Sequence, residues 1–285
     1  MKKSRTIYIL LNVLFMVVAL FFVNYNALLS ADFGFPKIIL ILVLFILIHV
    51  VRFARMYFIL LEDLIRPNRF LQIYLKTTFV STLIPFKIGE IFKMYCYGYE
   101  TDSLMKGVLA VLIEKFFDAI VLCSFMLPFS VMNGKMDSLL IILVGFVLVV
   151  LMVYGSFMGT YKYLNKFLIC RAGGKKSLRI LKFLEVVKVT HDTAKRMVKG
   201  RFIILLAFSF IAWAIEAVLV AFMDNNGVNF DFKMIFSYIS DAFFGVFNTY
   251  FNYYVTLCAV VFFVALVMVY GRKYLMIINQ RKGKR

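Results

Sequence analysis

The sequence lacks the motifs by which most soluble enzymes are recognised. It contains no Walker motif, no HExxH, no GxSxG and no pair of cysteines at metal-ligand spacing. Two histidines and four scattered cysteines leave few candidates for histidine-based or thiolate-based chemistry. We therefore expect no metal site and no cofactor, and a transport or binding role more than an enzymatic one. Catalysis by carboxylates inside a membrane stays open as an alternative.

Charged residues are also scarce, because they make up only 17% of the chain against 63% hydrophobic residues, and the mean hydropathy is +0.90. A soluble domain of this size needs far more polar surface. Several apolar runs reach the roughly 20 residues that cross about 30 Å of hydrocarbon. None alternates as the strands of a membrane β-barrel do. The composition predicts an all-α, polytopic transmembrane helix bundle, formed by a single integral membrane domain over residues 1–285.

The formal net charge of +18 comes from 33 Lys and Arg residues against 15 acids. The basic residues lie mainly between the apolar runs and at the two ends of the chain, which is the positive-inside pattern of cytoplasmic loops. The basic stretches lack the modules that bind nucleic acid, so we expect no nucleic-acid partner. Anionic lipids of the inner leaflet are the expected partners. This pattern predicts a multi-pass protein of the cytoplasmic membrane with the N- and C-termini in the cytoplasm.

The apolar runs predict about six to eight spans. Between two of them lies a basic segment, about 161–201, which is expected to be cytoplasmic and to contain an amphipathic helix on the inner leaflet. The full crossings are expected at about 7–29, 37–60, 104–132, 138–158, 202–223 and 254–270.

Two further apolar runs are too broken or too long for a simple crossing. Pro85 and Gly89 interrupt the first, so a re-entrant hairpin of two short helices is expected over about 70–98, entering from the cytoplasm. The second, about 234–250, is expected to be a hairpin or half-helix of opposite orientation. Interrupted backbone at membrane depth persists where it is buried in protein or lines a wet cavity. Two such breaks in an inverted repeat are a transporter design.

Charged residues surround the first break. Lys87, Glu90 and Lys93 are spaced by three, so a helix would place them on one side. The freed amides at the start of a half-helix attract anionic groups, and a lipid phosphate beside a lysine would fit. The alternative is an interfacial loop whose charges are solvated.

Other charges lie within apolar runs. Glu114 and Asp118 are four apart and face the same way, whereas Lys115 is expected on a different face of that helix. Glu216 is an isolated charge near the middle of its run, and Arg52 lies near the end of another. Acids at such depth are costly and usually face a cavity or a cation. The structural alternatives are a salt bridge from the acids to Lys87, Lys93 or Arg52, and an Arg52 that extends to the interface.

These motifs resemble the lysylphosphatidylglycerol synthase transmembrane-region family, also described as flippase-like. The first motif is a proline followed by Gly-Glu and a basic residue, and the second is Glu, a basic residue and Asp. RFARMY and AWAIEA resemble two further family segments. The matching positions are Pro85, Gly89, Glu90, Lys93, Glu114, Lys115, Asp118, Arg52, Arg55, Trp213 and Glu216. The later break departs from the pattern, because it has Gly245 and no proline.

The resemblance implies a domain that moves or presents a lipid-linked polar head group. Relatives carry a soluble aminoacyl-transferase domain that makes lysyl-phosphatidylglycerol. The chain ends soon after Arg272, so lysyl transfer is not expected here. The residues expected to bind a lipid head group are Pro85, Lys87, Gly89, Glu90, Lys93, Glu114, Asp118, Glu216 and Arg52.

The first hypothesis is therefore that this is a flippase-like protein, which binds a phospholipid or glycolipid head group and translocates or presents it across the cytoplasmic membrane. Two alternatives stay open. One is an intramembrane enzyme that modifies a lipid. The other is an accessory subunit that docks a lipid or polysaccharide synthase, in which case a cytoplasmic or membrane synthase would be a partner.

Overall fold

The computed structural model describes residues 2–21, 34–84, 87–133, 138–171, 174–223, 232–244 and 249–282. The regular structure of these residues is all helical, and no strand occurs among them. The helices are α1 Lys2–Phe21, α3 Phe35–Ile59, the 3-10 helix η1 Leu61–Asp63, α4 Pro67–Leu83, α5 Ile88–Glu100, α6 Leu104–Asn133, α7 Ser138–Arg171, α8 Lys175–Val198, α9 Phe202–Phe222, α10 Phe232–Phe244 and α11 Thr249–Lys282.

The prediction of a polytopic helical membrane protein is confirmed. Four segments are long and apolar enough to cross a bilayer, namely Phe35–Ile59, Ser138–Cys170, Phe202–Phe222 and Asn252–Gly271. Large apolar side chains cover their outer faces, as lipid-facing helices require. Examples are Val43 on α3, Val149 on α7, Ile203 on α9 and Val267 on α11, each about half exposed or more.

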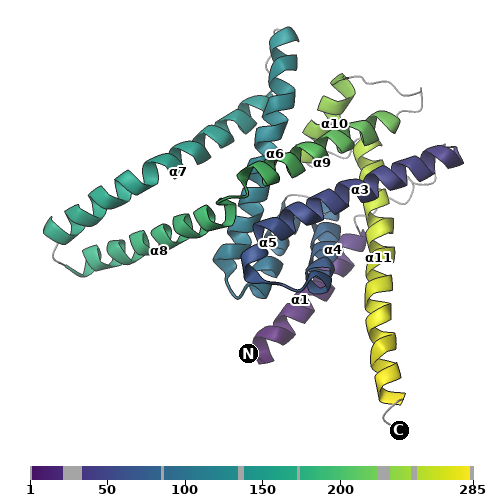
Figure 1. Cartoon of the computed structure of the whole chain (residues 1–285), viewed down its shortest axis with the longest axis horizontal. Coiled ribbons are helices and arrows are strands. Elements are labelled where there is room, and N and C mark those ends of the chain that lie inside the picture. The colour runs from purple at the N-terminus through teal and green to yellow at the C-terminus, as the bar shows by residue number, and fades with distance from the viewer. Residues whose placement is uncertain are drawn as a thin grey trace.

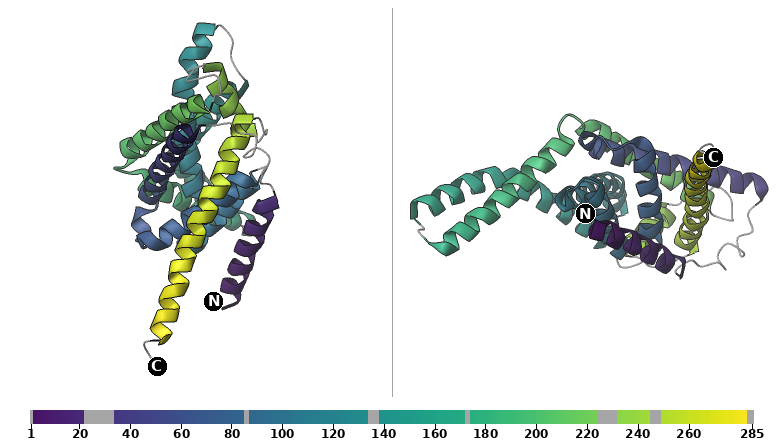
Figure 2. Two further views of the ribbon diagram at one scale, coloured as in Figure 1. Left: turned by 90° about the vertical axis from the view of Figure 1, so that its right-hand side faces the viewer. Right: turned by 90° about the horizontal axis from the view of Figure 1, so that it is seen from below.

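The helices cross at large angles around a common centre (Figure 1). There α3 runs along α9, α5 packs between α4 and α6, and α11 lies against α4. The N-terminal end of α1 and the C-terminal end of α11 lie at the same end of the molecule (Figures 1 and 2). The placement of both termini in the cytoplasm stays a prediction.

The broken run over 70–98 consists of two short helices, α4 and α5, which pack against each other. Pro85 lies outside the described residues. After the break, Lys87 takes a left-handed backbone conformation with φ of 61°, and α5 starts at the next residue. Gly89 permits the close packing, because a Cβ at this position would overlap with the backbone of Val80 and Ser81 on α4. Small residues allow helices to approach in this way.

The basic segment 161–201 differs from its prediction. The helix expected to end near 158 continues as α7 to Arg171, and α8 folds back beside it. The ring of His191 on α8 stacks on Tyr154 and Phe157 of α7, with centroid distances of 4.8 and 4.9 Å. The segment is therefore a helical hairpin that projects to one side of the body (Figures 1 and 2). The pattern of apolar residues foretold the helix α8 but not the partner that it packs against.

In the C-terminal part, the helix expected over 254–270 extends beyond both of these bounds as α11. The run 234–250, expected to be a hairpin or half-helix, contains most of the short helix α10 and the first two residues of α11. The orientation expected for this run stays a prediction. Gly245 lies outside the described residues, as do residues 22–29 of the crossing expected at 7–29.

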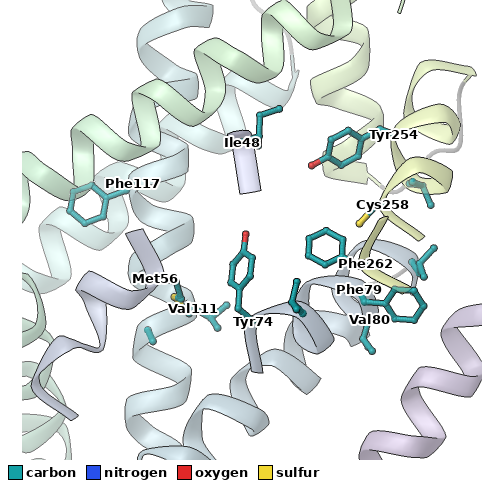
Figure 3. Packing of buried hydrophobic residues seen from close by; sticks show 14 of the residues in the cluster. Ile48, Met56, Tyr74, Phe79, Val80, Val111, Phe117, Tyr254, Cys258 and Phe262 are labelled. Carbon is teal, nitrogen blue, oxygen red and sulfur yellow. The ribbon is translucent and has the colours of Figure 1, made fainter. Parts of the chain in front are cut away.

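The apolar core lies where α3, α4, α6 and α11 meet (Figure 3). Aromatic rings fill much of it. The rings of His49 and Phe262 meet edge-on with their centroids 4.7 Å apart, and the ring centroids of Phe45 and Tyr254 are 5.4 Å apart. Figure 3 shows Tyr74 and Tyr254 pointing their hydroxyl groups inward from opposite sides. This core holds the helices that surround the charged side chains described next.

Candidate functional site

A cavity of about 550 Å³ lies among the helices, next to the apolar core. Its walls come from α3, α4, α5, α6, α7, α9, α10 and α11. Five cationic and four carboxylate side chains line it, and they are Arg52, Arg55, Lys87, Lys93, Lys115, Glu90, Glu114, Asp118 and Glu216. Burying so many charges is costly unless each is paired, so their pairing decides what the cavity can hold.

Arg55 is the centre of the most deeply buried group of charges, which we call the Arg55 cluster. Its side chain is fully buried. Nη2 donates to Glu114 at 3.0 Å, and Nη1 donates to Asp118 at 2.5 Å and to the hydroxyl of Ser209 at 2.6 Å. Lys93 donates to the other oxygen of Glu114 at 2.6 Å. One guanidinium thus joins α3 to α6 and α9, and α5 joins through Lys93.

A second ion pair lies at the start of α5. Lys115 Nζ is 2.8 Å from Glu90 Oε1, and the two side chains are 43% and 17% exposed. Lys87 lies next to this pair on the cavity wall. The second oxygen of Glu90, Oε2, is buried and has no hydrogen-bond partner among the described residues. The exposure of Lys115 and Glu90 makes this side of the cavity more open than the Arg55 cluster, and one carboxylate oxygen there has no protein partner among the described residues.

A third group joins the later helices to α3. Arg52 forms an ion pair with Glu216 of α9 and donates to the Tyr254 hydroxyl of α11 at 3.2 Å. The hydroxyl of Tyr238, on α10, donates to the other oxygen of Glu216 at 2.8 Å. The Arg52 guanidinium also lies 5.6 Å from the ring centroid of Trp213. We call Arg52, Glu216, Tyr238 and Tyr254 the Arg52 cluster.

Trp213 connects the two arginine clusters. Its indole N–H donates to Asp118 at 3.0 Å, while its ring lies under Arg52. His49 lies behind the Arg52 cluster, within hydrogen-bond distance of Tyr74 at 3.2 Å and of Tyr254 at 3.3 Å. Trp213 is the single tryptophan of the chain and lines the cavity, so its fluorescence can report on a bound ligand.

The structure brings together seven of the nine residues expected to bind a head group. Lys87, Glu90, Lys93, Glu114, Asp118, Glu216 and Arg52 all line the cavity. Gly89 acts behind it, in the contact between α4 and α5, and Pro85 lies outside the described residues. Their role in binding a lipid stays a prediction.

The structure also contains a buried salt bridge of the kind that was the structural alternative for Glu114 and Asp118. Glu114 pairs with Lys93, as that alternative allowed, but its second partner is Arg55 rather than Arg52. Lys115 was expected on a different face of its helix from Glu114 and Asp118, and it pairs with Glu90 of α5, although it lines the same cavity.

Several residues of the site were not expected to line it, although Arg55 and Trp213 had been named as matches to the family motifs. Arg55 follows Arg52 by three positions, and this spacing could have placed both on one face of the helix. Trp213 precedes Glu216 by the same interval. Tyr238 and Tyr254 carried no such signal, because tyrosines are common near the ends of membrane helices.

The described residues contain no group of three or more His, Cys, Asp or Glu side chains arranged to hold a metal ion. The carboxylates of the cavity lie against cations instead. Such a cavity suits a polar or charged group that can exchange partners with these ion pairs.

A bundle of apolar helices around a charged, partly open cavity defines a multi-pass membrane protein that can hold a polar group inside the bundle. The family model of the lysylphosphatidylglycerol synthase TM region matches residues 9–224. The chain belongs to this family, as its motifs suggested, and the family's name links it to the metabolism of membrane lipids. No curated protein and no solved structure gives a significant match. The family match ends before α10, so Tyr238 and Tyr254 lie beyond it.

Proposed function

We propose that the cavity binds the polar head group of a phospholipid or glycolipid, and that the protein translocates this head group across the cytoplasmic membrane or presents it there. The observation that supports this proposal is the cavity itself, in which nine charged side chains lie inside a bundle whose outer surface is apolar. Ionisable residues at such positions are expensive to bury and commonly mark the path of a polar substrate.

The lining of the cavity also offers a place for the acyl chains. Leu112 on α6 and Ile142 on α7 line the cavity and are 44% and 46% exposed. We infer from these exposed apolar side chains that the cavity opens toward lipid between α6 and α7. A lipid could place its head group among the charges while its chains stay in the bilayer, which avoids moving the chains through protein.

The ion pairs indicate which side chains meet which part of the head group. Lys87 and Lys115, beside the first turn of α5, would meet the phosphate, because backbone amides and cations together favour an anion. Glu90 would accept a hydrogen bond from a hydroxyl or ammonium group through Oε2, which has no hydrogen-bond partner among the described residues. Lys93 is held by Glu114, so it would contact phosphate only after that ion pair opens.

The test is lipid exchange in proteoliposomes that contain a fluorescent nitrobenzoxadiazole-labelled phosphatidylglycerol. Dithionite bleaches the label in the outer leaflet, so protein-catalysed exchange makes the inner label accessible. We expect exchange with the natural sequence and at least a tenfold lower rate with Glu90→Gln, since a charged hydrogen bond of about 1.5–3 kcal/mol is lost.

Glu185→Gln is the matched control, because Glu185 is an exposed glutamate on α8 far from the cavity lining. Binding is measured in parallel by Trp213 fluorescence in micelles with short-chain phosphatidylglycerol and with a short-chain glycolipid. Binding without exchange supports presentation of the lipid rather than translocation. Normal exchange by the Glu90→Gln protein, or the absence of any binding, contradicts the proposal.

A further inference from the structure

The Arg52 cluster raises a question that the head-group proposal leaves open. Both oxygens of Glu216 are already occupied, one by Arg52 and the other by the Tyr238 hydroxyl. Glu216 is also only 3% exposed. It therefore cannot receive a head group in this arrangement, although it was expected to do so from the sequence.

Arg52 is the accessible member of the pair. Its side chain is 20% exposed, against 4% for that of Glu216, and it lines the cavity. A guanidinium binds the oxygens of a phosphodiester through two parallel hydrogen bonds, in the same geometry by which it binds a carboxylate. An incoming lipid phosphate would thus meet Arg52 first and compete with Glu216 for it.

Within the described part of the chain, the other cation that acts on Glu216 is Arg55. Its guanidinium is held by Glu114, Asp118 and Ser209, so it is not placed to take over Glu216. The remaining groups that face Glu216 are Asp118 from α6, Tyr238 from α10 and Tyr254 from α11, and none of them is a cation. A buried carboxylate that loses its counter-ion is costly to keep charged, so it takes up a proton.

We propose that binding of a lipid phosphodiester to Arg52 is coupled to the uptake of one proton by Glu216. The phosphate replaces the carboxylate on the guanidinium, a proton from water joins the released Glu216 oxygen, and Tyr238 keeps its hydrogen bond to the other oxygen. Charge in the cavity is conserved by this exchange, because the proton offsets the charge of the phosphate. This inference rests on the proposed head-group function and adds a link between lipid binding and the proton gradient.

The exchange also explains a role for α10 and α11. These helices reach α3 and α9 through Tyr238 and Tyr254, which contact Glu216 and Arg52 directly. When Arg52 turns to the phosphate, Tyr254 loses the hydrogen bond that it accepts from Arg52, whereas Tyr238 keeps its hydrogen bond to Glu216. Lipid binding would thereby be communicated to α11, which follows the family match.

The experiment measures the affinity of the purified full chain for dihexanoyl phosphatidylglycerol between pH 6 and pH 8, by Trp213 fluorescence in maltoside micelles. A phosphodiester has no titratable group in this range, unlike a phosphate monoester. Proton uptake by Glu216 predicts that affinity falls about tenfold for each pH unit of increase. The Glu216→Gln variant should bind with an affinity that is independent of pH, because its amide cannot titrate.

Three further variants identify the titrating group. Glu185→Gln must keep the slope, because this glutamate lies outside the cavity. Tyr238→Phe removes a hydrogen bond to Glu216 without removing the carboxylate. Its affinity for the lipid must therefore still fall with increasing pH, with a shift in the pH at which a given affinity is reached. His49→Gln removes the histidine that lies beside Tyr254, and it must also keep the slope.

The outcomes separate this inference from the proposed function. Binding that does not depend on pH, or a slope that survives in Glu216→Gln, overturns the proton exchange and leaves the head-group site standing. The absence of saturable binding overturns both. Deacylated glycerophosphoglycerol is titrated in parallel, and equal affinity for it would assign the site to a free phosphodiester and overturn the lipid assignment. Weaker binding of the deacylated compound supports a lipid.

Discussion

The Arg55 cluster and the Glu90–Lys115 pair lie on the same cavity but differ in burial. Arg55 is fully buried and holds two acids and a serine from two other helices. Lys115 is nearly half exposed and holds one oxygen of Glu90. Charges of the first kind fix the positions of helices, because opening them would strand buried ions. Charges of the second kind can exchange partners at low cost, so they are better suited to a ligand.

This contrast predicts that Arg55→Met lowers the free energy of unfolding more than the other substitutions considered below. The substitution leaves Glu114 with Lys93 alone and removes the cation from Asp118. Breaking a buried ion pair on one side typically costs about 3–5 kcal/mol of the free energy of unfolding. The measurement is the unfolding transition in a dodecyl sulfate titration of protein in mixed micelles.

Arg66→Met provides the control for the loss of one arginine, because Arg66 is exposed just before α4. It should change the free energy of unfolding by less than about 1 kcal/mol. An equal loss from both substitutions would remove the distinction between the two kinds of charge.

An intermediate loss of the free energy of unfolding is expected from Gly89→Ala. This substitution tests whether the side of the cavity with the Glu90–Lys115 pair also depends on tight packing. The added methyl group would overlap with the backbone of Val80 and Ser81, so α5 must move away from α4. Overpacking of this kind costs about 1–3 kcal/mol. The same unfolding titration and the exchange assay both apply, since a displaced α5 also displaces Glu90.

Gly155→Ala is matched to this change, because Gly155 lies in α7 and no atom is within 4 Å of a Cβ added there. Alanine should leave stability unchanged or raise it by up to about 1 kcal/mol, through its higher helix propensity. If Gly89→Ala is as harmless as Gly155→Ala, the close contact between α4 and α5 is not required.

The smallest effect on stability is expected for Lys115→Gln. Ion pairs as exposed as this one contribute about 0–1 kcal/mol, so the unfolding transition should hardly move. Lipid exchange, in contrast, should fall at least tenfold, because a cation assigned to the phosphate is lost. Lys115→Arg should restore most of the exchange. A large loss of stability with normal exchange would reverse the roles that we assign to the two groups.

Much of the fold follows from local sequence properties. Long apolar runs determine α3, α9 and the apolar part of α11, because only a helix satisfies the backbone in lipid. The interruption near Gly89 separates α4 from α5 for an equally local reason. The extension of α7 to Arg171 was not foreseen, since it depends on packing against α8, whereas the helix α8 itself was expected from its apolar residues at helical spacing.

The candidate site was predicted only in part, and the predicted part also follows from local sequence properties. An acid or arginine within an apolar run is conspicuous, so Arg52, Glu114, Asp118 and Glu216 were found from sequence alone. The tyrosines that complete the Arg52 cluster were not, because a hydroxyl group on an aromatic ring is compatible with a core, an interface or a site. Their function depends on which side chain they meet.

The sequence by itself determined that this is a helical membrane protein with charges held at membrane depth, because hydropathy and charge act residue by residue. Tertiary structure alone decided which charge meets which. The pairing of Arg55 with Glu114 and Asp118, and of Arg52 with Glu216, depends on helices that are distant in the chain and meet only when the bundle forms. Electrostatic interactions act through space over a few ångströms, so their partners cannot be derived from spacing along the sequence.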